Sequence, residues 1–214
     1  MKVLSNIIKN IQNSILLIYY SFRDIFSSRK VPVSWSEGEK GVIVLIPGFA
    51  EKVSFIKLLG DRFNKNGYKV VYPNSLSRIN NIEENVDKVI SELNDLKIKS
   101  AIFITHKEGG LVAARVKEVR KDLIDKFIAI NTPWNIADIL GSRKRLIQSK
   151  DFIDFRNNKS LISGIINIYS KGNNTENTRL KGVKNILIDQ KGSIAVLSSK
   201  EVFKLISNLI NENN

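Results

Sequence analysis

The residues with the clearest potential for chemistry lie in the stretch AIFITHKEGG, residues 101–110. The apolar run at its start predicts a buried strand, and Gly109 and Gly110 permit a tight passage into a helix. Such a turn exposes the side chain at its apex, where Lys107 stands beside His106. A lysine amine can attack carbonyl groups, and a histidine can act as a general acid or base. This stretch is therefore the first candidate site.

The remaining composition narrows the chemistry available. His106 is the only histidine among 214 residues and cysteine is absent, which excludes thiolate nucleophiles and makes a metal site unexpected. Neither a G-x-x-x-x-G-K-[ST] phosphate loop nor a G-x-G-x-x-G dinucleotide loop occurs. We therefore expect no cofactor and no bound metal.

The charge balance is strongly basic. Lys and Arg number 34 against 21 Asp and Glu, giving a formal net charge of +13. Such a charge favours an anionic partner, whether membrane lipid, nucleic acid or an acidic protein. A coding bias toward Ile, Lys and Asn explains the lysines equally well, but not the shortage of acids. No helix-turn-helix, zinc spacing or aromatic RNA-binding pattern is visible, so no specific nucleic-acid recognition is expected.

Strand-like and helix-like segments alternate from residue 41 onward. Strands are predicted in GVIVLIPGF, YKVVYPNS, AIFIT, KFIAINTP, GIINIYS and NILID. Helices are predicted over residues 53–66, 81–97, 108–120 and 199–210, the last capped by Ser198 or Ser199. Strands rich in Ile and Val, separated by helices, indicate an α/β fold with a mostly parallel sheet and helices on both faces.

The chain divides into three parts. Residues 1–28 have apolar side chains at helical spacing and predict an amphipathic helix, which either packs on the domain or lies on a membrane. Residues 29–40 are predicted to be a linker, and 41–214 the α/β domain, with 134–160 as an inserted, lid-like segment. The longest apolar run near the N-terminus is too short to span a membrane, and no signal-peptide cleavage pattern follows it. We expect a cytoplasmic protein, peripheral at the membrane if the helix binds lipid.

Five motifs in order resemble the lipase-like branch of the α/β-hydrolases, the esterase and triacylglycerol-lipase type. VIVLIPGFAEKVSFIKLLGDRFNKNGYKVVYPN is similar to that family's oxyanion-loop strand, first helix and next strand. AIFITHKEGGLVAARV is similar to its G-H-S-x-G-G-L-x-A nucleophile elbow, and FIAINTPWNIADI to its T-P-H-x-G-T segment. IINIYSKGNN and GSIAVLSSKEVFKLI resemble the stretches that carry the catalytic acid and histidine. The resemblance implies an α/β-hydrolase fold from about residue 41 onward.

The same resemblance implies that the Ser-His-Asp triad is lost. The positions of the nucleophile, acid and base are occupied by Lys107, Asn173 and Ser193. Because the chain has no second histidine, no shift of alignment restores the triad. The family's oxyanion hole would be formed by the backbone N–H groups of Phe49 and Glu108, and His106 would pack beside the elbow.

The leading hypothesis is a catalytically inactive protein that binds a protein or lipid, or acts as a scaffold. One alternative is a hydrolase or carbonyl-active enzyme in which Lys107 forms a Schiff base; otherwise Lys107 fills the pocket or pairs with Glu108 or another acid. A second alternative is a peripheral membrane module that binds anionic lipid through the N-terminal helix and a basic cluster in the insertion, Arg143, Lys144, Arg145 and Lys150. Four more cations occur on the helix that follows the elbow, Arg115, Lys117, Arg120 and Lys121. The ligand and the oligomeric state are left open.

Overall fold

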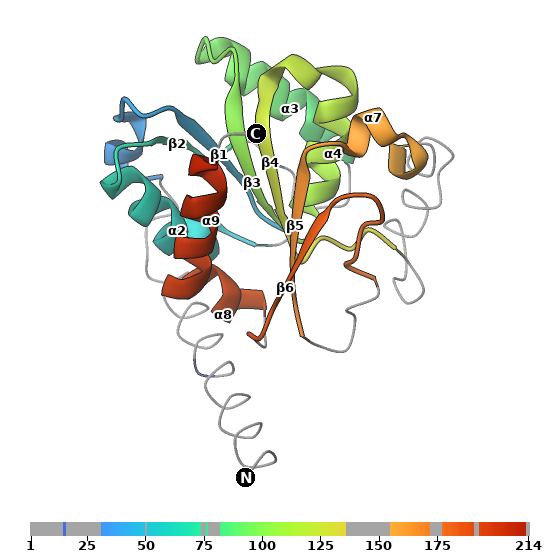
Figure 1. Ribbon diagram of the computed structural model, residues 1–214. Coiled ribbons are helices and arrows are strands. Elements are labelled where there is room, and N and C mark those ends of the chain that lie inside the picture. The colour runs from blue at the N-terminus through green and yellow to red at the C-terminus, as the bar shows by residue number, and fades with distance from the viewer. Residues whose placement is uncertain are drawn as a thin grey trace.

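Six parallel strands form one sheet at the centre of the molecule, in the order β2-β1-β3-β4-β5-β6 (Figure 1). The computed structural model describes residue 15 and residues 31–49, 51–73, 76, 82–135, 155–171, 177–190 and 193–212. The strands are β1 (Val42–Ile46), β2 (Lys69–Val71), β3 (Ala101–His106), β4 (Ile124–Ile130), β5 (Ile165–Ser170) and β6 (Lys184–Ile188). Every neighbouring pair runs parallel, so all strands finish at the same edge of the sheet.

The chain order reverses between β1 and β3. From β1 the chain moves outward to β2 and then returns to the other side of β1 to form β3. The carboxyl ends of two such adjacent strands diverge into loops on opposite sides of the sheet, which leaves a crevice where ligands commonly bind. The loop after β1 and the turn after β3 meet here, and both candidate motifs lie in them.

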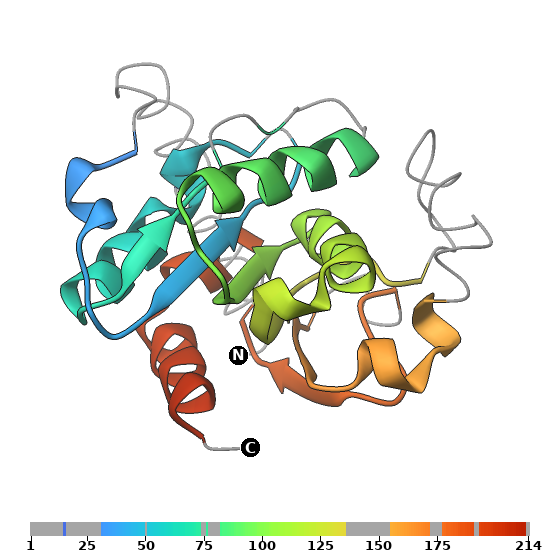
Figure 2. The same ribbon diagram turned by 90° about the horizontal axis from the view of Figure 1, so that it is seen from above.

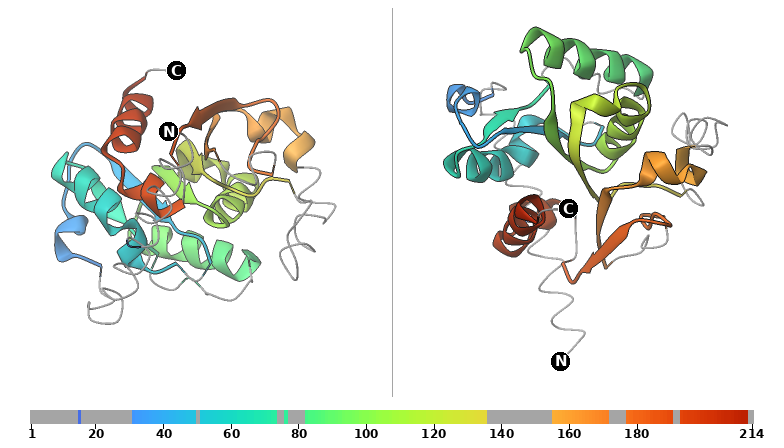
Figure 3. Two further views of the ribbon diagram at one scale, coloured as in Figure 1. Left: turned by 90° about the horizontal axis from the view of Figure 1, so that it is seen from below. Right: turned by 45° about the horizontal axis from the view of Figure 1, so that its top comes forward.

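Helices cover both faces of the sheet because successive strand residues point in opposite directions (Figures 2 and 3). In β1, Ile43 and Leu45 belong to one buried cluster, whereas Val44 and Ile46 belong to another. The first face is covered by α2 (Val53–Lys65), α8 (Ser193–Ser198) and α9 (Lys200–Asn211). The second is covered by α3 (Ile82–Asp95) and α4 (Gly109–Val119), with the short α7 (Lys159–Ile162) near its edge.

The expected α/β class, parallel sheet and element order are confirmed. Several element boundaries differ from expectation by one to three residues; α4, for example, begins at Gly109 rather than Glu108. The strand β2 has only three residues. Of the two candidate caps for the last helix, Ser199 is the one used, since its side chain accepts hydrogen bonds from the N–H groups of Glu201 and Val202.

Residues 31–40, expected to be a linker, contain a short 3-10 helix, η1 (Val33–Ser36), that anchors them to the domain. Trp35 is fully buried and its indole Nε1 donates to Asp61 Oδ1 at 3.0 Å. A Cβ on Gly60 would lie 2.2 Å from the Trp35 ring, so this ring occupies the space that a side chain on α2 would need. The polar composition of the segment gave no sign of this contact.

Several expectations lie outside the described residues. These are the N-terminal helix over residues 1–28 apart from residue 15, most of the insertion over 134–160, and the basic cluster Arg143, Lys144, Arg145 and Lys150. The two described ends of the insertion are part of the core, because Trp134 and Phe155 are both fully buried. Within the described ranges, no helix combines the length and the apolar character needed to cross a membrane.

Candidate functional site

The candidate site lies in the turn between β3 and α4, at the edge where the strands finish (Figure 3, left). Lys107 occupies the apex with a φ of 47°, in the left-handed region that residues with a side chain seldom adopt. Its N–H donates to the carbonyl of Ile130 at the end of β4, at 2.9 Å, which holds the turn against the neighbouring strand. The turn therefore has the strained geometry of an elbow that presents one side chain.

The two glycines after the apex are required by close packing. A Cβ on Gly109 would lie 2.3 Å from the Ile46 carbonyl oxygen, and one on Gly110 would lie 2.0 Å from Thr132 Oγ1. Both distances are far below van der Waals contact, and the first involves backbone that cannot rotate away. The glycine pair thus lets α4 start directly against the ends of β1 and β4.

Another acidic side chain organises the site, and sequence reasoning missed it. Glu51, in the loop after β1, is 8% exposed. Its Oε2 accepts hydrogen bonds from Gly48 N–H at 2.9 Å and from His106 Nδ1 at 2.7 Å. Its Oε1 accepts from Lys107 Nζ, also at 2.7 Å. One carboxylate therefore joins the β1 loop to both the last residue of β3 and the apex of the elbow.

These partners keep Glu51 ionised. Burial alone would raise the pKa of its carboxyl group, but the interactions with His106 and then with Lys107 outweigh burial and lower the pKa from 4.5 to about 2. Since an ionised carboxylate can only accept, His106 Nδ1 must carry the shared hydrogen. His106 is fully buried, and its Nε2 has no hydrogen-bond partner among the described residues. The imidazole ring is thus bonded to Glu51 through Nδ1 and buried from solvent.

The backbone N–H of Phe49, in the loop after β1, also donates to a carboxylate of this chain. Phe49 N–H donates to Glu108 Oε2 at 3.2 Å, and Glu108 is 6% exposed. A Cβ on Gly48 would lie 2.9 Å from Glu108 Oε2 and 3.2 Å from Glu51 Oε2, so both carboxylates converge on this glycine. The backbone N–H groups of Gly48 and Phe49 are consecutive, and each therefore donates to a carboxylate of the protein itself.

The structure brings six of the sequence-predicted residues together: Phe49, His106, Lys107, Glu108, Gly109 and Gly110. Of the three interpretations of Lys107, pairing with an acid is the one observed, although the partner is Glu51 rather than Glu108. Asn173 lies outside the described residues, and Ser193 is described only as the first residue of α8. In the described part of the chain, no three His, Cys, Asp or Glu side chains are grouped so as to hold a metal ion.

No protein-family model matches the sequence. Comparison with curated protein sequences also finds no match.

Solved structures, by contrast, match at low identity over most of the chain. A carboxylesterase of the thaumarchaeon Nitrososphaera gargenis has a TM-score of 0.63 and 12% identity, covering 81% of this chain and 92% of that one. A Bacillus licheniformis lipase has a TM-score of 0.61 and 14% identity, covering 80% and 92%. The enol-lactonase of Burkholderia xenovorans has a TM-score of 0.59 and 14% identity, covering 82% and 95%. Together with the six-stranded parallel sheet and the elbow, these matches show that the chain has the α/β-hydrolase fold.

Proposed function

We propose that this protein is a catalytically inactive, lipase- and esterase-like member of the α/β-hydrolases that acts as a binding or scaffold protein. The observation that carries the proposal is the hydrogen bond from Phe49 N–H to Glu108 Oε2. In an active enzyme of this type, that N–H would stabilise the oxyanion of the tetrahedral intermediate. Here an internal carboxylate holds the donor instead.

Electrostatics argues against hydrolysis at this place. A developing oxyanion would approach Phe49 N–H against the negative charge of Glu108, with ionised Glu51 close behind at Gly48. Removing one oxyanion donor from an active hydrolase costs roughly 10²–10³ in rate. An N–H donor that already bonds to a carboxylate offers still less stabilisation, because that carboxylate repels the developing oxyanion.

The two side chains that could take part in nucleophilic attack, Lys107 and His106, are both bonded to Glu51. Lys107 stands where the family has its serine, and its ammonium donates to Glu51. His106 lies beside the elbow, but its Nδ1 shares a hydrogen with Glu51 and its Nε2 is buried. A general base must reach the proton that it removes, either directly or through one water. In the described part of the chain, this ring is bonded to Glu51 and buried from solvent, and Lys107 Nζ is bonded to Glu51 instead.

The test is multiple-turnover hydrolysis of p-nitrophenyl acetate and butyrate, measured for wild type, Lys107→Ala and a matched control. The control is Lys204→Ala, which removes an equally charged, exposed lysine from α9. We expect all three proteins to release p-nitrophenol at the same background rate. Turnover well above background that is lost in Lys107→Ala but kept in Lys204→Ala would refute the proposal.

The same proteins test the carbonyl-active alternative. The Lys107 side chain is 37% exposed, so a small aldehyde can reach it. Borohydride reduction in the presence of benzaldehyde, followed by mass spectrometry of peptides, should label Lys107 no more than other exposed lysines. Preferential labelling of Lys107 would replace the inactive-scaffold proposal with a Schiff-base function.

A further inference from the structure

A second candidate site lies at the opposite edge of the sheet from the elbow. A cavity of about 560 Å³ is lined by the first residues of β4, β5 and β6, the end of α4, and the end of α9. Cavities that bind small molecules typically measure roughly 300–1,000 Å³. The floor is apolar, formed by Ile124, Phe127, Ile165 and Val183. Gly164 also lines the cavity and leaves space beside it, because a Cβ added there would meet nothing within 4 Å.

The cavity is unusually rich in lysine. Five ammonium groups line it against two carboxylates, which leaves a net charge of +3: Lys117, Lys121, Lys126, Lys159 and Lys184, with Asp125 and Glu212. Two of these lysines are held by the end of α9. Lys126 Nζ donates to carbonyls at the end of α9, and Lys184 pairs with Glu212 at 2.8 Å. The remaining cations are therefore Lys117, Lys121 and Lys159.

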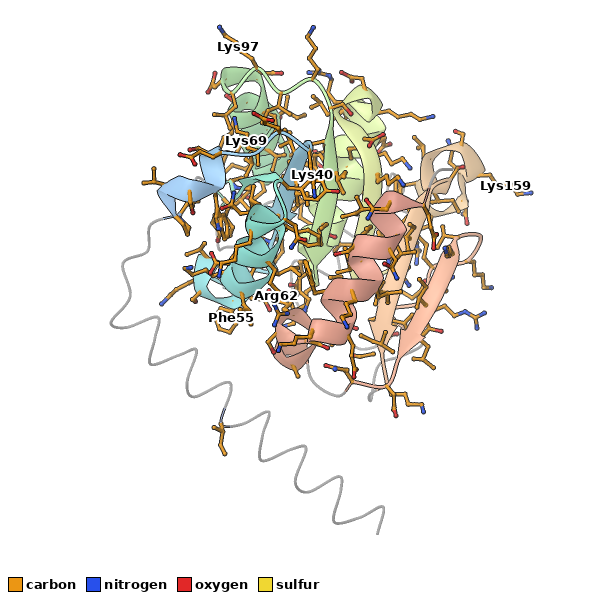
Figure 4. All side chains as sticks on the ribbon, turned by 60° about the vertical axis from the view of Figure 1, so that its left-hand side comes forward. Lys40, Phe55, Arg62, Lys69, Lys97 and Lys159 are labelled. Atoms are coloured by element: carbon orange, nitrogen blue, oxygen red, sulfur yellow. The ribbon has the colours of Figure 1, made fainter. Side chains whose placement is uncertain are left out.

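These lysines differ from the arginines on the same stretch of chain. Arg115 pairs with Glu83 and Glu118, and Arg120 forms two hydrogen bonds with Asp122. By contrast, neither Lys121 nor Lys159 has an ion-pair partner in the described ranges. Lys159 projects outward from α7 at the edge of the molecule (Figure 4), and it is one of the residues that line the cavity.

Lys117 is the most constrained of the three. It is only 6% exposed, and its Nζ donates to the carbonyl oxygen of Ser163 at 2.5 Å rather than to an acid. Burial, and then the charge of Lys121 nearby, lower the pKa of its amine to about 8. A buried cation beside a like charge is unfavourable unless an anion neutralises it.

We propose that this basal cavity, lined by Lys117, Lys121 and Lys159, binds a small polyanion of phosphate type. The anion would accept hydrogen bonds from the buried and rim ammonium groups, while the apolar floor accommodates an attached organic group. The site is independent of the proposed function at the elbow, since it shares no residue with it. Its volume of about 560 Å³ suits a small ligand better than a membrane surface or a nucleic acid.

Isothermal titration calorimetry with tripolyphosphate and with 1-naphthyl phosphate, at about 0.15 M salt, tests the proposal, because this salt screens exposed charges beyond about 8 Å. We expect saturable binding to wild type, and an affinity about tenfold lower for Lys117→Gln and for Lys121→Gln, as for the loss of one charge-assisted contact. Lys204→Gln, the matched control at an exposed position of α9, should change affinity by roughly twofold or less. Lys121 is exposed at the start of the 3-10 turn η2 (Lys121–Leu123), so its variant stays informative even if the buried Lys117 variant fails to fold.

Proton uptake supplies a second readout. A bound anion favours the charged form of Lys117, so at pH 8 binding should take up protons and its heat should depend on the ionisation enthalpy of the buffer. This dependence should disappear in Lys117→Gln. Absence of saturable binding, or an equal loss of affinity in Lys204→Gln, would overturn the proposal. So would binding of anionic vesicles or oligonucleotides through these lysines when neither phosphate probe binds.

Discussion

Replacing Glu51 by glutamine isolates the charge at the centre of the elbow. Glutamine keeps the size of the side chain but removes the negative charge that Lys107 and His106 face. Whichever way its amide is turned, glutamine also places an NH₂ group against at least one of the three present donors, which then lacks an acceptor. The variant should therefore fold to the same structure with a smaller free energy of unfolding.

The size of the loss follows from the pKa of Glu51. The folded protein lowers that pKa from 4.5 to about 2, and each unit corresponds to about 1.4 kcal/mol, so the ionised form contributes about 3 kcal/mol at pH 7. Because the pKa is depressed in the folded state, this contribution is complete above about pH 4.5 and is lost as pH falls toward 2. At pH 3 it should amount to only about 1 kcal/mol.

Urea denaturation followed by circular dichroism at pH 7 and at pH 3 measures both values. The matched control is Glu84→Gln on α3, which removes a more exposed i,i+4 partner of Lys88 and should cost about 0.5 kcal/mol or less. If Glu51→Gln cost no more than this control at pH 7, or cost the same at both pH values, the carboxylate would not be the electrostatic centre of the elbow.

Three further changes probe the surrounding structure. Gly109→Ala should destabilise the protein by about 3 kcal/mol or prevent folding, because its Cβ would lie 2.3 Å from the Ile46 carbonyl oxygen; a urea midpoint equal to that of wild type would show that the elbow can relax. Trp134→Phe removes the 2.9 Å bond from Nε1 to Asn167 Oδ1 and should cost about 1–3 kcal/mol in the same assay, whereas an unchanged free energy of unfolding would mean that Asn167 finds another donor. Lys107→Ser alone should leave p-nitrophenyl ester turnover at background, since His106 is fully buried with its Nδ1 bonded to Glu51, and the Glu51 carboxylate, whose pKa is lowered to about 2, is a weak base; a rise of a hundredfold would show that one of these two groups acts as a general base at position 107.

The sheet could be predicted from sequence because burial on both faces leaves continuous runs of Ile and Val, as in β1 and β3. The apex of the elbow could be predicted for a similar local reason, since the strand, Lys107 and the glycine pair are contiguous. Glu51 could not, because its contact with His106 spans 55 residues and exists only where β1 lies beside β3. The single available signal was an acidic residue shortly after the Pro-Gly turn.

For Glu108, the sequence predicted a role for the backbone but not for the side chain. The resemblance assigned position 108 a role through its backbone N–H, which any residue type could fill. Its side chain matters more in the structure, because the left-handed apex turns that side chain toward the loop after β1, where it meets Phe49 N–H. Similarly, the sequence did not distinguish Lys117 and Lys121 of the basal cavity from the arginines beside them, because it does not show that Glu83, Glu118 and Asp122 pair with the arginines.

The carboxylate of Glu108 also has a consequence for redesign. Efforts to install esterase activity on this scaffold would naturally begin by placing serine at the apex, yet the donor opposite the apex would still be held by an anion of the protein itself. An incoming carbonyl would have to displace that anion before it could be polarised. Redesign should therefore begin at position 108 with a small neutral residue, and only then change the apex.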